Sequence, residues 1–295
     1  MPDFALLLTP RAPIGVFEHL EQELSSEAPR VRNVTRKWDD EQAALVLARV
    51  SHRMKGIIQS ATAPGASLWV AMPPACSEFL WLDPGLYFIA AKLRLGLPLN
   101  ESGTVCPQCR QATDDTLGDH ALKCMSGGRR TLAHNAIRDT VNSLLSECLL
   151  RPHRETHPFA ANPAARMDIS VLLDGKEYLV DIALTHPVQA RTQNDAANTP
   201  GGAATAYEAV KVAEYGAHVN IGTQVLVPLV FDTFGAVGVS GQKFLTRIAS
   251  EYSKRYLSGR CGRLEFFARL NGCVTHQVAL IAATNLPAMN LPAGH

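Results

Sequence analysis

Residues 166–184 read RMDISVLLDGKEYLVDIAL, and this stretch decides the fold. Its centre, Asp174-Gly175, is a strong signal for a two-residue hairpin turn, because both central positions of the favoured turn need positive φ. The apolar runs on either side, residues 167–173 and 177–184, are therefore predicted to be two antiparallel strands. The register of that hairpin then fixes where the few charged residues of these strands lie.

Two acidic side chains meet in this register. Pairing outward from the turn places Asp168 opposite Asp181, with Cβ atoms about 5 Å apart on the same side of the sheet. Two carboxylates that close among apolar residues repel each other, and a divalent cation removes the conflict. Mg²⁺ takes one or two protein carboxylates and completes its shell with waters and phosphate oxygens. The alternative is that one aspartate is exposed and the other accepts a salt bridge from Arg166 or Arg191.

A second cluster lies upstream of the hairpin. Cys106, Cys109, His120 and Cys124 form the pattern C-x2-C-x10-H-x3-C. A Cys-x2-Cys turn lets two thiolates converge on one ion, and a His/Cys pair four residues apart adds two ligands from one helix face. This complete set of soft ligands predicts a closed structural zinc site. The alternative is three unrelated buried thiols and a surface histidine.

The rest of the chain predicts an α/β (α+β) organisation. Residues 1–103 are expected to be mainly helical, residues 104–128 to form the zinc knuckle, residues 129–285 to form a mixed sheet flanked by helices, and residues 286–295 to be a disordered tail. Helices are predicted at 16–26, 41–61, 84–95, 131–150, 203–215, 242–257 and 263–283, further strands at 153–159 and 224–231, and a polar loop at 186–202.

Composition excludes several classes of protein. Hydrophobic residues make up 46% of the 295 residues and charged ones 19%, which excludes intrinsic disorder. No apolar run approaches the roughly 20 residues of a membrane span, and no secretory signal is visible. The balance of 28 basic against 27 acidic residues argues against bulk attraction to nucleic acid but permits a local basic surface. The odd number of cysteines, seven, favours a reducing compartment, the nucleus or the cytoplasm.

Four sequence blocks follow one another between residues 104 and 216. They are Cys106-Pro107-Gln108-Cys109 with Asp115 to His120 and Cys124; Gly127-Gly128-Arg129 with His134-Asn135; Arg166-Met167-Asp168 through Asp181; and Ala209-Val210-Lys211 to Glu214-Tyr215-Gly216. Together they resemble the carboxy-terminal endonuclease segment of site-specific non-long-terminal-repeat retrotransposons that insert into ribosomal RNA genes. In that family a zinc knuckle precedes a nuclease related to restriction enzymes of the PD-(D/E)xK type.

The resemblance implies a set of catalytic residues. Asp168 and Asp181 would bind catalytic Mg²⁺ or Mn²⁺, beside the structural zinc of the knuckle. The wider nuclease class has a lysine two residues after the second acid, where this chain has Ala183. The retrotransposon branch takes its lysine from the following helix, where this chain has Lys211. Asp139, on the helix before the strands, is the candidate for a third acid.

The same resemblance implies a DNA substrate and, as partners, DNA, RNA and a reverse transcriptase domain or protein in the nucleus. Arg129, Arg130, His134 and Arg166 are the candidate DNA contacts, and residues 1–103 correspond to a helical linker. The expected reaction is hydrolysis of a DNA phosphodiester to a 5′-phosphate and a 3′-hydroxyl. A zinc-stabilised module that binds nucleic acid without cleaving it is the alternative, and nucleotide binding at the glycine-rich residues 235–241 ranks below both.

Overall fold

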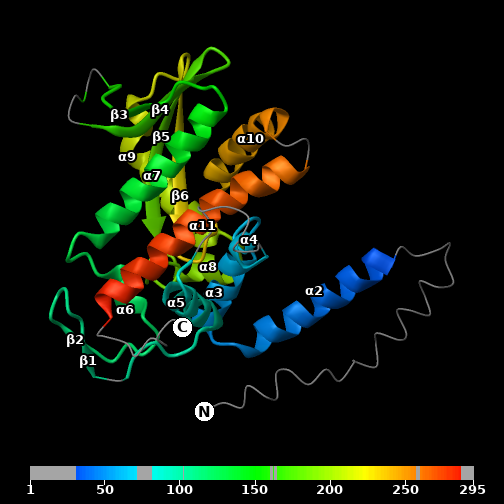
Figure 1. Ribbon diagram of the computed structural model, residues 1–295, viewed down its shortest axis with the longest axis vertical. Helices are drawn as coiled ribbons and strands as arrows, with labels where there is room; N and C mark the ends of the chain where they lie inside the picture. The colour runs from blue at the N-terminus through cyan, green and yellow to red at the C-terminus, as the bar shows by residue number, and fades with distance from the viewer. Residues whose placement is uncertain are drawn as a thin grey trace. The chain divides into compact units, whose positions relative to one another are not determined.

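The computed structural model describes residues 31–71, 82–101, 103–159, 162, 165–256 and 260–286 (Figure 1). It divides into two compact units, residues 1–51 and 52–295. The described part of the first unit is one helix, α2 (Val31–Arg49). The helix predicted at 16–26 and nearly all of the predicted tail lie outside the described residues. No described helix has the length and apolarity needed to cross a bilayer.

A four-stranded mixed sheet organises the second unit. The strand order is β3 (His153–Thr156), β4 (Met167–Leu173), β5 (Lys176–Thr185) and β6 (Gln224–Asp232). The first two pairings are antiparallel and the third, between β5 and β6, is parallel. Asp174 and Gly175 have φ values of 48° and 73°, so the predicted two-residue turn is confirmed. The predicted α/β class is confirmed as well.

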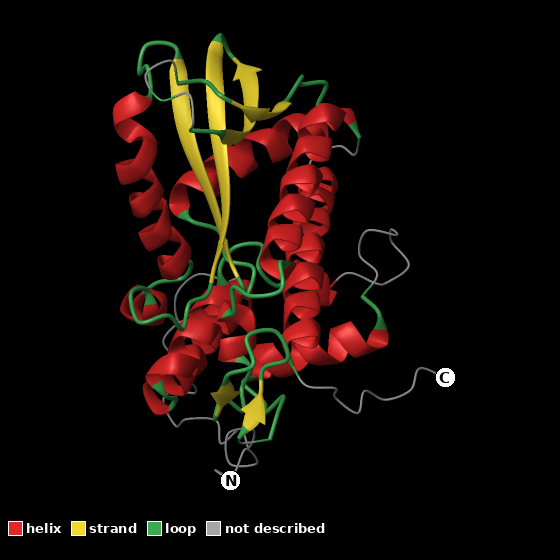
Figure 2. Cartoon of the chain, turned by 90° about the vertical axis from the view of Figure 1, so that its left-hand side faces the viewer, coloured by secondary structure: helices red, strands yellow, loops and turns green. Residues whose placement is uncertain are grey.

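Helices cover both faces of this sheet. α9 (Gly202–Tyr215), followed by the 3-10 turn η4 (Gly216–His218), connects the parallel strands β5 and β6 and lies on one face. α7 (Arg129–Glu147) and α11 (Arg260–Asn285) lie on the opposite face, as Figure 2 shows with the strands between them and α9. α10 (Val239–Arg255) packs on β6 and α11.

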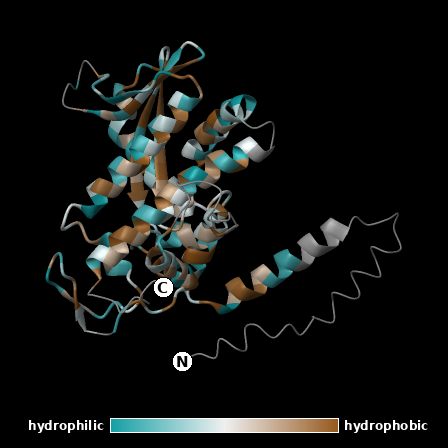
Figure 3. Ribbon diagram, viewed as in Figure 1, coloured by the Kyte–Doolittle hydropathy of each residue, from teal (hydrophilic) through white to brown (hydrophobic). Residues whose placement is uncertain are grey.

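The main core lies between the sheet and α7, α10 and α11. Long strands β5 and β6 are coloured mostly as hydrophobic in Figure 3, because both of their faces are covered. The core also takes in α3 (His52–Thr62) and α5 (Pro84–Leu95), through Ile57, Ile89 and Leu93. A short helix, α4 (Leu68–Ala71), contacts α11. The boundary predicted at residues 103 and 104 stays a prediction, while Ile57, Ile89 and Leu93, which precede it, share a core with the sheet.

Two predicted elements are wrong. The helix predicted at 41–61 is two helices, α2 ending at Arg49 and α3 beginning at His52, because periodicity does not register a break between two successive apolar stripes. The predicted loop 186–202 contains a helix, α8 (Gln193–Asn198). Its two buried alanines pack on α3, where a Cβ built on Gly56 would lie 3.4 Å from that of Ala196. Tertiary packing therefore stabilises a helix whose polar sequence gives no helical signal.

Candidate functional site

The predicted zinc ligands come together beside a small hairpin. Strands β1 (Thr104–Val105) and β2 (Ala112–Thr113) flank Cys106 and Cys109, while α6 (Asp119–Lys123) carries His120 and is followed directly by Cys124. The four ligand atoms all lie within 4.8 Å of one another. Cys106 Sγ is 3.9 Å from Cys124 Sγ, and Cys109 Sγ is 3.3 Å from His120 Nε2. Donors of a tetrahedral zinc site, at about 2.3 Å for sulfur and 2.1 Å for nitrogen, are about 3.5–3.8 Å apart. These residues could hold zinc.

Local hydrogen bonds prepare this cluster. Burial opposes ionisation of Cys106, but hydrogen bonds from the backbone of Cys109 and Gln108 lower its pKa to about 7. A thiolate is the form that binds metal. The Asp115 carboxylate accepts hydrogen bonds from the backbone N–H groups of Leu117, at 3.1 Å, and of His120. The loop is therefore held in its ligand-binding conformation by its own backbone contacts.

The two aspartates lie where strands β4 and β5 part. The paired positions run from Leu173–Lys176, next to the turn, to Ile169–Val180, which is the predicted register. One step further, the Asp168 side chain accepts a hydrogen bond from the backbone N–H of Ile182 at 2.7 Å. Asp168 and Asp181 are 7% and 6% exposed. The divergence of the strands leaves both carboxylates at the edge of an opening rather than inside a continuous ladder.

Helix α9 delivers a cation to these carboxylates. Lys211 Nζ forms ion pairs with Asp181 Oδ2 at 3.2 Å and with Glu214 Oε2 at 3.4 Å. Burial, and to a lesser degree the charge of Asp168, raises the pKa of Asp181 to about 6 although Lys211 opposes the shift. Burial also raises the pKa of Tyr215 to about 12, together with its hydrogen bond to Glu214.

These side chains line one pocket with a volume of about 740 Å³. Basic, acidic and aromatic groups meet there from α7, α9 and the two strands. The lining residues include Arg130, His134, Arg166, Asp168, Asp181, Tyr207, Lys211, Glu214 and Tyr215. A pocket with two buried carboxylates and several cationic groups suits an anionic ligand held through a bound cation.

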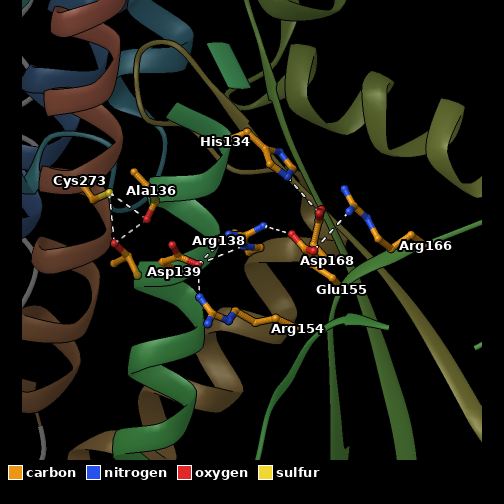
Figure 4. Close-up of polar contacts among 10 residues, drawn as sticks. His134, Ala136, Arg138, Asp139, Arg154, Glu155, Arg166, Asp168 and Cys273 are labelled. Atoms are coloured by element: carbon orange, nitrogen blue, oxygen red, sulfur yellow. Dashed lines mark hydrogen bonds and ion pairs between the residues drawn. The ribbon is translucent and has the colours of Figure 1, made fainter. Parts of the chain in front are cut away.

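Among the predicted DNA contacts, His134 and Arg166 reach the pocket in different ways. His134 Nε2 lies 3.0 Å from Asp168 Oδ1 (Figure 4), so this side chain helps to orient the carboxylate. Arg166 is half exposed, and its guanidinium lies 3.3 Å from Glu155 Oε2. Both side chains line the opening, where a phosphate group could approach them.

Arg129 and Arg130 make internal contacts. Arg129 Nε donates to Thr284 Oγ1 at 3.2 Å, on α11. Arg130 donates to the carbonyl oxygens of Leu122 and Leu184 at 2.5 and 2.7 Å. The guanidinium of Arg130 is thus bonded to the backbone at two places and is not a freely extended surface charge.

The structure places the predicted third acid outside the pocket. Asp139 Oδ1 pairs with Arg138 at 3.0 Å and with Arg154 at 2.9 Å (Figure 4), and the carboxylate is about half exposed. Glu214 lines the pocket instead. The signal that could have found Glu214 is its position three residues after Lys211, which places both side chains on one face of α9.

The glycine-rich segment 235–241 has its backbone donors occupied. Glu208 accepts hydrogen bonds from the N–H groups of Ser240 and Gly241 at 2.9 and 2.8 Å. A Cβ on Gly238 would lie 2.2 Å from the carboxyl carbon of Glu208, so this glycine makes room for a protein carboxylate. The contact caps the first turn of α10 and takes the donors that a nucleotide phosphate would need.

Comparison with known proteins gives no further identification. No protein-family model matches the chain, and no curated protein matches it significantly.

Proposed function

We propose that this protein is a metal-dependent endonuclease that cleaves DNA phosphodiester bonds to a 5′-phosphate and a 3′-hydroxyl. The single observation that carries the proposal is the junction of Asp168, Asp181 and Lys211 at the point where β4 and β5 part. Two nearly buried carboxylates and an ammonium group, 3.2 Å from one of them, face a pocket that also holds His134 and Arg166.

Asp168 and Asp181 are the residues that would hold Mg²⁺ or Mn²⁺. Carboxylate oxygens are the ligands these hard cations prefer, and a site with one or two carboxylates leaves room for substrate phosphate. Burial raises the pKa of Asp181, so an approaching cation relieves an electrostatic cost already present in the fold. When bound, the cation supplies positive charge against the phosphate and makes a nearby water more acidic.

The protein's own groups then act on the phosphate. Lys211 carries a positive charge beside the carboxylates, close to where the phosphate would lie. Negative charge grows on the phosphate in the transition state, and a cation already fixed in place stabilises that charge without reorganisation. His134 holds Asp168 in one orientation through its 3.0 Å contact. Arg166, at the rim, offers a guanidinium that can bond the phosphate backbone in bidentate fashion.

The remaining parts of the proposal come from the family resemblance. The zinc knuckle would hold the DNA duplex, RNA or a reverse transcriptase would be a partner, and the protein would work in the nucleus as part of a retrotransposon. The knuckle geometry supports the first of these, because the loop whose residues could hold zinc lies directly before α7, whose first turns reach the pocket.

A second candidate function is nucleic-acid binding without cleavage. Ala183 stands where the wider nuclease class has a lysine, and it packs with Ala204, Val230 and Tyr207 in a small apolar cluster. Ala183 also lines the pocket, but its methyl group brings no charge there. Under this alternative, Lys211 only neutralises Asp181 and the pocket has no hydrolytic role.

Nicking of supercoiled plasmid in Mg²⁺ or Mn²⁺ separates the two functions. Asp168→Asn and Asp181→Asn are the test variants, and Asp174→Asn is the matched control, because asparagine also suits the hairpin turn at the far end of the same strands. We expect nicking by the wild type and the control, and none by the two test variants. DNA binding without nicking by the wild type would favour the binding module, and nicking that survives both substitutions would overturn the proposed site.

A further inference from the structure

The zinc knuckle is tied to the strand that carries Asp181. Arg130, on the first turn of α7, donates one guanidinium N–H to the carbonyl of Leu122 and another to the carbonyl of Leu184. Leu122 lies on α6 between the zinc ligands His120 and Cys124, and Leu184 lies on β5, three residues after Asp181. Leu184 also lines the carboxylate pocket. One side chain therefore bridges the two candidate metal sites.

His186 forms a second link between the end of β5 and α6. His186, which directly follows β5, is fully buried. Its Nε2 lies 3.2 Å from Asp119 Oδ1 on α6, and its Nδ1 lies 2.7 Å from Thr233 Oγ1. Arg53 holds the same aspartate through two contacts of 2.7 Å. The carboxyl end of β5 is thus fastened to α6 on both sides of Thr185.

A bound zinc ion would add to the protein contacts that hold helix α6. It has five residues, too few for an isolated helix to be stable in water. Two of the four zinc ligands, His120 and Cys124, lie within or directly after it, so a bound ion would fix both its ends. Structural zinc contributes its binding energy to folding of the segment that holds it. Loss of the ion would release the acceptor carbonyl of Leu122 and, with it, the anchor of Arg130.

We infer that Arg130 is a positioning residue that makes order and cation affinity at the carboxylate pocket depend on the zinc knuckle. The Arg130 side chain holds the carbonyl of Leu184, near the end of β5, only while it is also bonded to the carbonyl of Leu122 on α6. The part of this inference that concerns cation affinity rests on the proposed function, whereas the part that concerns order of β5 does not. The role differs from a DNA contact, in which the guanidinium would bond a phosphate group rather than the two carbonyls.

The test compares two arginines of the same helical turn. Arg130→Met removes the bridge, and Arg129→Met is the matched control because its guanidinium contacts Thr284 on α11. The full chain is purified with zinc, its metal content is measured, Mn²⁺ binding is followed by calorimetry, and amide hydrogen exchange is followed at residues 182–186. We expect both variants to keep one zinc per chain. Arg130→Met should weaken Mn²⁺ binding by about 10-fold or more, as loss of a partner that orients metal ligands usually does, and should accelerate exchange at 182–186.

A third variant tests the direction of the coupling. Cys106→Ser, which removes one zinc ligand, should weaken Mn²⁺ binding and accelerate the same exchange, and should add little in the Arg130→Met background. Equal exchange in Arg130→Met and Arg129→Met would overturn the inference, as would full additivity of the two changes. Weaker DNA binding by Arg130→Met with unchanged exchange would identify a DNA contact and also overturn it. A wild type that binds no Mn²⁺ would contradict the proposed function, and exchange would then decide the coupling alone.

Discussion

The ionised side chain of Asp232 is predicted to lower the free energy of unfolding at neutral pH. This residue ends β6 and is fully buried. Its Oδ1 accepts hydrogen bonds from the N–H groups of Phe234 and Ala236 at 2.8 and 3.1 Å. Ser60 and the charge of Arg94 also favour the ionised form, but burial outweighs all of these contacts. Burial raises its pKa to about 6. A pKa of about 6 in place of the ordinary value near 4 corresponds to a penalty of about 3 kcal/mol on the ionised form.

The sign of the effect follows from proton binding. Because the native pKa lies above the unfolded one, the native state holds more protons between about pH 4 and 6, and stability from this group falls as pH rises through that window. Asp232→Asn removes the charge and keeps an oxygen for both N–H groups. We therefore expect Asp232→Asn and the wild type to have nearly equal free energies of unfolding at pH 4. At pH 7.5 the variant should be more stable than the wild type by up to about 3 kcal/mol.

Urea unfolding followed by circular dichroism at pH 4.5, 5.5, 6.5 and 7.5 gives this difference directly. Asp232→Ala is the contrasting variant, because it removes the acceptor of two buried N–H groups and should lower stability by about 1–3 kcal/mol at low pH, where the wild-type carboxyl is neutral. A difference between Asp232→Asn and the wild type that is constant with pH, or that shrinks as pH rises, would refute the reasoning.

Three further substitutions test other parts of the structure. Lys211→Met should slow single-turnover nicking about 100-fold or more. The affinity for Mn²⁺ should stay the same or rise, because the ammonium group that competes for the carboxylate is gone. Slower nicking caused only by weaker DNA binding would contradict this role. Glu147→Gln should lower the free energy of urea unfolding by about 1–3 kcal/mol, because it breaks a two-oxygen pair with Arg269 at 2.6 and 2.7 Å between α7 and α11. Gly118→Ala should lower the melting temperature, because φ at this residue is +84° and the new Cβ would lie 2.7 Å from Leu99 Cδ1. An unchanged melting temperature would contradict this close packing of the loop on Leu99.

The hairpin and the cluster of three cysteines and a histidine could be predicted because their signals are local. Asp174-Gly175 fixes both the turn and the register, so the positions of Asp168 and Asp181 follow from counting along two strands. The spacing of the four candidate ligands likewise limits which residues can converge on one ion. Both features depend on residues within about 20 positions of one another, where chain geometry leaves few alternatives.

Other features could not be predicted because they depend on which side chains and elements pack against one another in the folded chain. Periodicity places Asp139 on α7 but not the arginines that hold it away from the pocket. Sequence also cannot show that Arg130 bonds two backbone carbonyls, because any exposed arginine near a helix start has the same local pattern. α8 forms because its alanines pack on α3. In each case the partner, not the residue itself, decides the outcome.

Product chemistry at the nick tests the central claim most directly. Plasmid nicked by the wild type with Mg²⁺ is freed of protein and treated with DNA ligase, which seals only a 3′-hydroxyl next to a 5′-phosphate. Hydrolysis at the Asp168 and Asp181 site predicts nicks that ligase seals without prior end repair, and no nicks from Asp181→Asn. Nicks that resist ligase, or that form equally with Asp181→Asn, would contradict it.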